Sequence, residues 1–248
     1  MSVHPLISII TVTYNAAGVI EKTLDSLKEQ SFKDFEHIVI DGASTDDTLS
    51  LVKGYGIGNT VIISEKDSGL YHAMNKGMRM AKGDFILFLN AGDRFHSSKT
   101  LENYANVTGS DTDIIYGDTD IVDFQGNFVS HRHLSAPENL THKSFSKGML
   151  ICHQAFMVRR TMAPEYDLRY RFSSDYDWCV KCIGLSSSLR CIRIPDVTID
   201  YLNDGLTDKN KLKSLKERFT IMTKHYGLPT TLMNHLGFVV RALRRGNL

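Results

Sequence analysis

Residues 6–16 read LISIITVTYNA, an apolar run that ends abruptly in polar residues. A continuous run rich in isoleucine and threonine is typical of a strand buried on both faces, as strands of parallel sheets are. Val19, Leu24 and Leu27 then recur at helical spacing directly after the polar turn. The stretch therefore predicts a strand, a loop and a helix, which is the repeating unit of a parallel sheet.

Strand and helix patterns alternate along the chain as far as residue 105. The successive pairs are FEHIVID (35–41) and STDDTLSLVKGY (44–55), TVIISE (60–65) and GLYHAMNKGMRMA (69–81), and GDFILFL (83–89) and SSKTLENYA (97–105). Parallel neighbours need crossover connections, so this order predicts an α/β fold. Its Rossmann-like, mostly parallel central sheet should carry helices on both faces.

The remaining chain is less regular. IIYGD (114–118) is a fifth strand candidate, and a hairpin is expected at FQGN (124–127). Helical patterns occupy 174–185 and 211–227, where Gly227 is the expected stop, and 191–202 reads as extended.

The composition argues against several classes of protein. The formal net charge is +1 at pH 7, so no nucleic-acid partner is expected. The one C-x-x-C pair, Cys179 and Cys182, has no second pair to complete a zinc site, so buried reduced thiols are the preferred interpretation. No apolar run approaches the roughly 18 to 20 residues of a membrane span, and the opening residues lack the basic region of a signal peptide. We expect a cytoplasmic protein.

Polar residues follow each predicted strand. In order along the chain these are Thr13, Tyr14 and Asn15; Asp41, Ser44 and Asp46; Glu65, Lys66 and Asp67; Asn90, Ala91, Gly92 and Asp93; and Gly117 and Asp118. Ligands of open parallel sheets bind beyond the carboxyl ends of the strands. Asp46 or Asp118 alone is better explained as a helix cap or turn former. Together, however, carboxylates on one edge repel each other without a cation or hydrogen-bonding ligand, which predicts a metal bound with a phosphate-bearing substrate.

The first loop argues against two nucleotide-binding classes. Neither G-x-G-x-x-G nor G-x-x-x-x-G-K-[ST] follows the predicted strand at 6–13. Those glycines let a backbone wrap around phosphates. Dinucleotide oxidoreductases and P-loop NTPases are therefore not expected.

Several strings carry a family resemblance. They are SIITVTYNA (8–16), HIVIDGASTDDT (37–48), SEKDSGLYHAMNKG (64–77), GDFILFLNAGD (83–93), IIYGD (114–118) and RFSSDYDW (171–178). In order and spacing, through about residue 180, the chain resembles the inverting family 2 glycosyltransferases of the GT-A fold, especially bacterial members that build capsule, O-antigen or exopolysaccharide. The resemblance implies transfer of a sugar from a nucleotide-sugar donor, with UDP the expected nucleotide, to an acceptor hydroxyl.

The resemblance also implies a donor pocket at the first strand ends. Thr13 and Tyr14 would flank the base, and Asp41 would accept from a ring N–H of the base. The other residues assigned to this pocket are Asn15, Ser44, Asp46, Asp67, Asn75, Lys76, Asn90 and Ala91. Lys76 would offset the diphosphate charge.

The metal signature of the family is altered in this chain. The family carries Asp-x-Asp, often followed by another Asp, where this chain has Asn90, Ala91, Gly92 and Asp93. Asp93 is the carboxylate that remains. The resemblance therefore implies a weakly held Mg²⁺ or Mn²⁺ that arrives with the donor diphosphate.

The resemblance makes Asp175, in SSDYDW, the catalytic base, with Asp177 two residues further on. Contacts with the sugar or acceptor are expected from Asp118, His153, Gln154 and Gly205. Gly205 lies in YLNDGLT (201–207), which is expected to close over the donor.

Two other histidines receive a different interpretation. His131 and His133 in SHRH have metal-like spacing but no evident partners, so an exposed loop is favoured.

The C-terminal segment predicts an amphipathic basic helix. Its apolar positions are Leu232, Leu236, Val239, Val240 and Leu243, and its basic positions are Arg241, Arg244 and Arg245. Such a helix can pack on the core of the protein or lie peripherally on the inner face of the cell membrane. The second arrangement would suit a lipid-linked glycan acceptor.

We expect one domain, 1–248, with a nucleotide-sugar-binding half (1–118), an acceptor-side half (119–210) and C-terminal helices (211–248). A sugar-phosphate nucleotidyltransferase is one alternative, although it would carry a Gly-rich, Arg-containing first loop. A nucleotide-sugar-binding module without turnover is the other, suggested by the missing carboxylates at Asn90 and Gly92.

Overall fold

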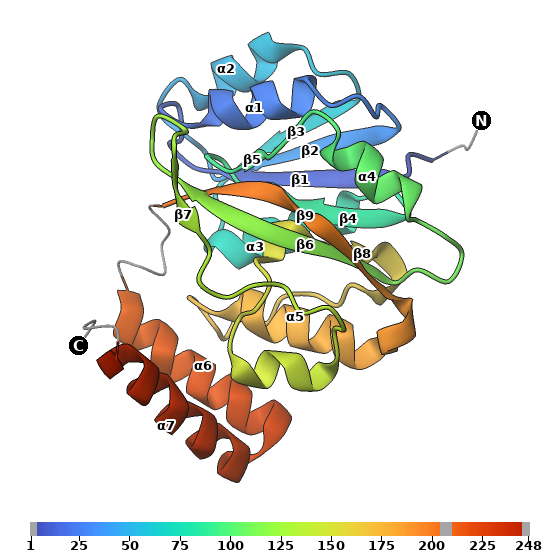
Figure 1. The fold of residues 1–248 in the computed structure, drawn as a ribbon. Helices are drawn as coiled ribbons and strands as arrows, with labels where there is room; N and C mark the ends of the chain where they lie inside the picture. Colours follow the sequence, from blue (N-terminus) through green and yellow to red (C-terminus); the bar gives the residue numbers. More distant parts are fainter. Residues whose placement is uncertain (1–3, 204–209, 245–248) are drawn as a thin grey trace.

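The computed structural model describes residues 4–203 and 210–244 (Figure 1). Its strands are β1 (Ile7–Thr13), β2 (Phe35–Asp41), β3 (Thr60–Ser64), β4 (Phe85–Phe88), β5 (Arg94–Phe95), β6 (Ile114–Val122), β7 (Phe128–His131), β8 (Phe156–Arg159) and β9 (Cys191–Leu202). Its α-helices are α1 (Ile20–Lys28), α2 (Thr48–Tyr55), α3 (Leu70–Met80), α4 (Thr100–Asn106), α5 (Ser174–Leu185), α6 (Lys211–Tyr226) and α7 (Leu228–Arg244).

The strands form one nine-stranded sheet in the order β3-β2-β1-β4-β8-β6-β9-β5, with β7 added beside β6. β1, β2, β3 and β4 pair in parallel, and β6 pairs in parallel with β9. β8 is antiparallel to both β4 and β6, so those two strands point the same way. The carboxyl ends of β1, β2, β3, β4 and β6 therefore meet along one edge, as the sequence predicts for these five strands.

Helices cover both faces of the sheet (Figure 1). On β2, Ile38 and Ile40 face the main core, whereas Val39 joins a separate cluster beneath α1 and α2. α3 lies so close to the sheet that a Cβ on Gly77 would stand 2.5 Å from Ile10, which explains the glycine in mid-helix. The predicted mixture of a mostly parallel sheet and flanking helices is confirmed.

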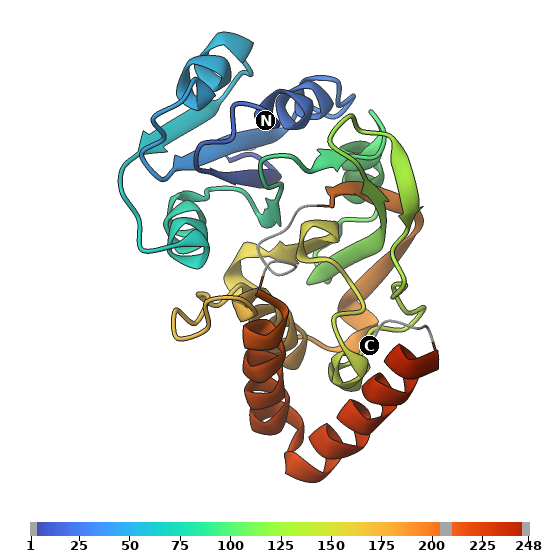
Figure 2. The ribbon, with the colours of Figure 1, turned by 90° about the vertical axis from the view of Figure 1, so that its left-hand side faces the viewer.

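The C-terminal helices form a hairpin beside α5, which opens as a V in Figure 2. His225 of α6 binds Asp177 of α5, and the Tyr226 hydroxyl donates to the His142 carbonyl. Gly227 ends α6, as predicted. None of the helices in the described ranges is both long and apolar enough to cross a membrane.

Two sequence predictions about element boundaries need correction. α2 begins at Thr48 rather than at Ser44, because residues 42–47 form a loop that is hydrogen-bonded to the loop after β1. β6 continues to Val122, so Asp118 lies inside a strand and not at its end. The predicted hairpin does follow, between β6 and β7.

Candidate active site

The carboxylate of Asp41 sits at the end of β2 and is fully buried. Its Oδ2 accepts from the Ser44 amide at 2.9 Å and from the Ser64 hydroxyl at 2.6 Å, and its Oδ1 accepts from the Ser44 hydroxyl. All of these donors are uncharged. Oδ1 therefore keeps an acceptor position for one further N–H donor.

Beside Asp41, the glycine of the Asp-Gly pair allows two side chains to approach. A Cβ on Gly42 would stand 3.0 Å from a carboxylate oxygen of Asp67 and 3.3 Å from the Tyr14 ring. Tyr14 is 65% exposed, so its ring offers an open face. An exposed aromatic face next to a buried acceptor is an arrangement that suits a nucleobase.

The loops after β1 and β2 are joined to each other. The Asn15 amide donates to the Ser44 hydroxyl, and the Asn15 side chain accepts from the Thr45 amide at 2.9 Å. Asn15 and Ala43 both have positive φ angles, 47° and 63°. Strained backbone of this kind persists where surrounding contacts enforce it and clusters at functional sites.

Asp46 acts as a connector between these loops. Its oxygens accept from the Ala17 amide at 3.0 Å and from the amide and hydroxyl of Thr48. The Thr48 hydroxyl chiefly, with the amides, lowers the pKa of Asp46. Asp46 therefore joins the two loops, and its Oδ2, which accepts only from the Ala17 amide, keeps an acceptor position for the predicted nucleotide contact.

Two buried oxygens at the strand ends have no hydrogen-bond partner within the described ranges. They are Oγ1 of Thr13 and Oδ1 of Asn90. Ala91, between Asn90 and the following turn, donates its amide to the Val12 carbonyl at 3.5 Å. Unpaired buried acceptors are costly, and here they mark positions where a ligand or cation can bind.

Asp93 is buried at the other side of this turn. Its Oδ2 accepts from Gln154 Nε2 at 2.7 Å and its Oδ1 from the Leu202 amide at 3.0 Å. Burial raises the pKa of the Asp93 carboxyl to about 6. A buried carboxylate with only neutral hydrogen-bond donors has an uncompensated negative charge, which a bound cation would stabilise.

His153 links this turn to the predicted base. Its Nε2 lies 3.4 Å from the Asn90 amide nitrogen, and its Nδ1 lies 3.6 Å from Asp175 Oδ2. If Asn90 donates to Nε2, the ring proton is on Nδ1 and faces Asp175. Because Gln154 contacts Asp93, two adjacent residues join the base to both ends of the Asn-Ala-Gly-Asp turn.

Asp175 is the second residue of α5, with 18% of its side chain exposed. The Tyr71 hydroxyl donates to its Oδ1 at 3.0 Å. Burial alone would raise the pKa of Asp175, but the hydrogen bond and charge of His153 outweigh it, so the pKa is lowered. Burial and the negative charge of Asp175 raise the pKa of Tyr71 well above its ordinary value. The carboxylate is therefore ionised at neutral pH and open on one side.

Asp177 is excluded as the base by its partners. It is completely buried, and it binds His225 at 2.7 Å and Lys181 at 2.5 Å. These contacts attach α6 to α5. These partners favour Asp175 over Asp177 as the catalytic base, because Asp177 is used to hold α6.

The structure corrects the expectation for Asn75. Its side chain is 1% exposed, donates to the Tyr166 carbonyl and accepts from the Tyr166 amide. Both amide atoms hold this segment, which stacks the Tyr166 ring on Tyr71 at 5.3 Å. In the same GLYHAMNKG string, Tyr71 is the residue that contacts the predicted catalytic base, Asp175. Tyr71 lies one helical turn before Asn75, and this spacing could have indicated its role from the sequence.

Lys76 and Asp118 also make contacts that differ from the sequence expectations. Lys76 Nζ binds Glu65 at 2.8 Å, so it reaches the sheet edge already paired. Asp118 is bound by Arg193 at 2.8 Å and by the Ala136 amide at 2.7 Å, which makes it a structural residue of β6. Gly205 lies outside the described residues.

Comparison with protein families identifies the family of this chain. The profile described as Glycosyl transferase family 2 matches residues 8–166. A PGL/p-HBAD biosynthesis glycosyltransferase of Mycobacterium tuberculosis is 32% identical over 252 residues, which cover 97% of this chain and 91% of the relative. The amylovoran biosynthesis glycosyltransferase AmsB of Erwinia amylovora is 29% identical, covering 76% of this chain and 67% of the relative.

Solved structures share the fold. TarS (residues 1–349) of S. aureus superposes with a TM-score of 0.71 at 19% identity, over 94% of this chain and 72% of that one. The mannosyltransferase PcManGT of Pyrobaculum calidifontis, solved with GDP-Man and Mn²⁺, gives a TM-score of 0.62 at 18% identity, over 100% of this chain and 77% of that one. The fold is that of GT-A glycosyltransferases.

Proposed function

The chain belongs to glycosyltransferase family 2, and from that membership we propose that it inverts the anomeric centre of a UDP-sugar while transferring the sugar to an acceptor hydroxyl. As a member of this family it is a glycosyltransferase, which decides against the nucleotidyltransferase and binding-module alternatives. The observation that best supports the proposed mechanism is the link that His153 and Gln154 make between Asp175 and the turn at Asn90 and Asp93. It brings an ionised carboxylate to the edge at which the donor would bind.

Asp175 would act as the general base. One of its carboxylate oxygens takes the proton of the acceptor hydroxyl as the hydroxyl oxygen bonds to the anomeric carbon. The bond from that carbon to the diphosphate oxygen breaks in the same displacement, and the nucleoside diphosphate leaves. Tyr71 and His153 hold the carboxylate in place, because each contacts a different oxygen of it. A single displacement inverts the stereochemistry.

The donor nucleotide would bind at the ends of β1 and β2. The Tyr14 ring would stack on the base, and Asp41 Oδ1 would accept from the base's ring N–H. Thr13 and Asp67 would complete the pocket on either side, the former with its unpaired hydroxyl oxygen. A UDP-bound form of TarS superposes with a TM-score of 0.68, above the 0.62 of the GDP-Man-bound mannosyltransferase, so UDP is the nucleotide that we propose.

Asn90 and Asp93 fit a divalent cation. The former has a buried unpaired amide oxygen, and the latter has a desolvated carboxylate with a pKa of about 6. These residues would hold Mg²⁺ or Mn²⁺ together with the donor phosphates, since such ions accept ligands from substrate and water. When bound, the ion supplies positive charge for the departing diphosphate. The mannosyltransferase neighbour contains Mn²⁺ with its donor.

The relatives point to polysaccharide or glycolipid assembly as the pathway. The names of two of them refer to PGL/p-HBAD and amylovoran biosynthesis. We propose a lipid-linked acceptor, at the inner face of the cell membrane, as the finer assignment.

The C-terminal hairpin supplies a surface for such contact. Residues 211–248 hold eight Lys or Arg residues and one acidic residue, Glu217. On α7, Leu232, Met233 and Leu236 are 53%, 77% and 67% exposed. The side chains of Arg241 and Arg244 lie outside the described residues. Apolar and basic residues on one hairpin favour an anionic lipid surface. We expect the protein to co-sediment with anionic vesicles and not with neutral ones. Binding to neither kind of vesicle, or equal binding to both, would refute this.

The proposed division of the chain follows these roles. The half at 1–118 would bind the donor, 119–210 would supply the base and the acceptor side, and 211–248 would meet the membrane. The halves share the sheet, because β6 crosses the boundary at Asp118.

Calorimetry tests the donor assignment. UDP, GDP and dTDP are titrated with and without Mn²⁺ into the wild type and Asp41→Asn, whose amide nitrogen would meet the base N–H donor to donor. We expect UDP to bind with Mn²⁺ enhancement and the variant to lose about 100-fold in affinity, since a polar mismatch of this kind is strongly discriminated. Asp175→Asn is the matched control and should bind as wild type. Absence of binding by all three nucleotides to the folded wild type would refute the assignment.

A further inference from the structure

A second group of polar side chains lies where β5, β6, β7 and β9 meet. Asp120 of β6 and Asp200 of β9 are direct partners across the parallel pair, so both side chains point to the same face of the sheet. They are 6% and 4% exposed. Two neighbouring buried carboxylates repel each other unless positive charge is supplied.

Two histidines approach these carboxylates from neighbouring segments. His96 Nδ1 lies 2.6 Å from Asp200 Oδ1, and His131 Nδ1 lies 2.8 Å from Asp120 Oδ1. One ligand atom each from His96, Asp120 and Asp200 lies within 4.8 Å of the other two. No partner of His131 is evident from the sequence, because Asp120 reaches it only through the β6–β7 pairing.

We propose that His96, Asp120 and Asp200 bind a divalent transition-metal ion with the ligand preferences of Zn²⁺, and that His131 is the fourth ligand. Imidazole nitrogens and carboxylate oxygens are ligands of Zn²⁺, whereas Mg²⁺ prefers oxygen alone. The set contains two nitrogens and two oxygens, the number that a tetrahedral site requires. This site is separate from the donor cation at Asn90 and Asp93, and it does not rest on the proposed function.

His96, Asp120 and Asp200 are close enough together for small movements to complete their part of the site, whereas His131 is placed by its contact with Asp120. Metal–ligand distances of about 2.0 to 2.1 Å place tetrahedral ligands about 3.3 Å apart, so His96 must move away from Asp200 by less than an ångström. The His96 and His131 side chains are 43% and 80% exposed and have room for this change. The two aspartates are fixed by the strands that carry them.

Arg94 completes the surroundings of the site. Its Nε binds Asp200 Oδ2 at 2.7 Å, and a terminal nitrogen donates to the Gly126 carbonyl of the β6–β7 turn at 3.0 Å. The guanidinium therefore orients the carboxylate and leaves Oδ1 toward His96. It supplies one positive charge for two buried carboxylates, and a divalent ion supplies the remainder.

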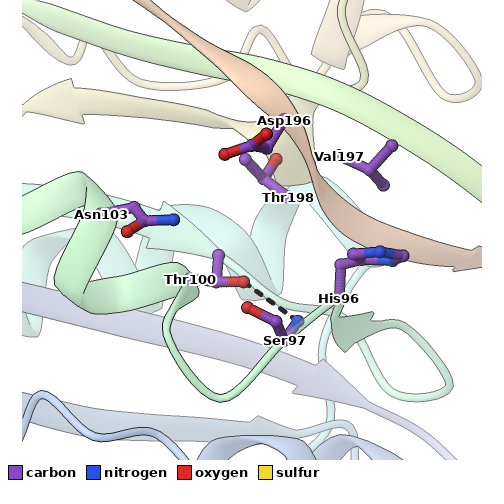
Figure 3. A pocket seen from close by; sticks show the side chains of 7 residues that line it. All are labelled: His96, Ser97, Thr100, Asn103, Asp196, Val197 and Thr198. Atoms are coloured by element: carbon purple, nitrogen blue, oxygen red, sulfur yellow. Dashed lines mark hydrogen bonds between the residues drawn. The ribbon is translucent and has the colours of Figure 1, made fainter.

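The site can be reached from solvent. His96 stands at one end of a pocket of about 240 Å³ (Figure 3). The other lining residues are Ser97, Thr100, Asn103, Asp196, Val197 and Thr198. His96 is the proposed ligand that lines this pocket, so the pocket gives an ion a path as far as the His96 ring.

An ion at this position would stabilise the end of β9. Leu202, two residues after Asp200, donates its amide to Asp93. Metal binding would therefore tie β5, β6 and β9 together beside the turn that holds the donor site. Because only the folded chain presents these ligands together, the ion should raise the melting temperature.

The test uses the full chain, stripped with EDTA and dialysed, without nucleotide. Zn²⁺ is titrated calorimetrically, and the melting temperature is measured in parallel. We expect one ion per chain. His96→Ala and His131→Ala, which change exposed side chains and should fold, should each lose at least about 10-fold in affinity, and the double variant should bind none at this site. His4→Ala, which removes an exposed histidine elsewhere, should bind as the wild type does.

Two results would overturn the proposal. If the folded wild type binds no Zn²⁺, the cluster is a set of histidine–carboxylate contacts and no metal site. If the double variant binds as tightly as the wild type, the ion is held elsewhere. Asp93→Asn should abolish nucleotide-linked Mn²⁺ binding and leave the Zn²⁺ titration unchanged, which separates the two cation sites.

Discussion

Asp41 and Asp93 lie at strand ends on the donor edge, whereas Asp118, Asp120 and Asp200 lie inside β6 and β9. The first two accept hydrogen bonds from backbone amides, hydroxyls and an amide side chain. The other three face arginine or histidine. A carboxylate satisfied only by neutral donors keeps its charge uncompensated, so a base N–H or a cation still gains from binding it.

The comparison also explains why the two regions were not equally visible in the sequence. At the donor edge, the residues that can bind a ligand are identified by their position directly after a strand. Between β6 and β9, the partners come from distant segments and are matched by strand register. Charge pairing there holds strands together, and the proposed Zn²⁺ site lies where two of these carboxylates, Asp120 and Asp200, are partners across the strands.

The largest expected effect concerns Asp175, which contacts a histidine as Asp120 and Asp200 do, yet is the proposed base at the donor edge. Asp175→Asn removes the base and keeps the shape, so kcat should fall at least about 1,000-fold while donor binding is retained. Release of nucleoside diphosphate in the presence of acceptor measures it. Asp177→Asn is the matched control: it should lower the melting temperature through the loss of charge facing His225 and Lys181. If Asp175→Asn retained its activity, Asp175 would not be the catalytic base.

A smaller effect is expected in the pH dependence of stability. The pKa of Asp93 is raised to about 6 in the folded protein, from about 3.9 when unfolded. Its contribution is therefore fully present below pH 4 and is lost as pH rises through 6. Relative to wild type, Asp93→Asn should gain about 2 to 3 kcal/mol in the free energy of unfolding between pH 4 and 7.

Urea unfolding of both proteins across this pH range, without metal or nucleotide, measures the Asp93 effect. Parallel curves for the two proteins would show that Asp93 is already charge-compensated. The contrast with the paired aspartates would then be wrong for this residue.

The smallest effect sharpens the other side of the comparison. Asp118→Asn weakens the contact with Arg193 and keeps the shape, so the free energy of unfolding should fall by about 1 to 2 kcal/mol. Nucleotide affinity should stay within about 2-fold of wild type, because Asp118 makes only structural contacts in β6. Denaturant melts and nucleotide calorimetry measure both quantities. A large loss of nucleotide affinity with unchanged stability would instead move Asp118 to the donor site.

Much of the site was nonetheless visible in the sequence. The strand-end positions of Tyr14, Asp41 and Asn90 follow from parallel topology alone, because the carboxyl ends of parallel strands share one edge. Asn75 was misassigned because a helix has several faces, and only packing decides which one is buried. For the same reason, the sequence could not show that Tyr71, and not Asn75, is the residue of this helix that reaches the site.

The sequence by itself determined the alternation of β1 to β4 with α1 to α4, since hydrophobic periodicity and turn residues are local properties, but it did not indicate the short strands β5 and β8. It also determined the helix at 174–185 and the extended segment at 191–202, both of which the structure reproduces. The tertiary structure alone decided that Asp175 meets His153 while Asp177 meets α6, and that His131 meets Asp120. Those contacts join residues far apart in the chain or on opposite sides of one helix, and they exist only after strand pairing and helix docking have fixed the register.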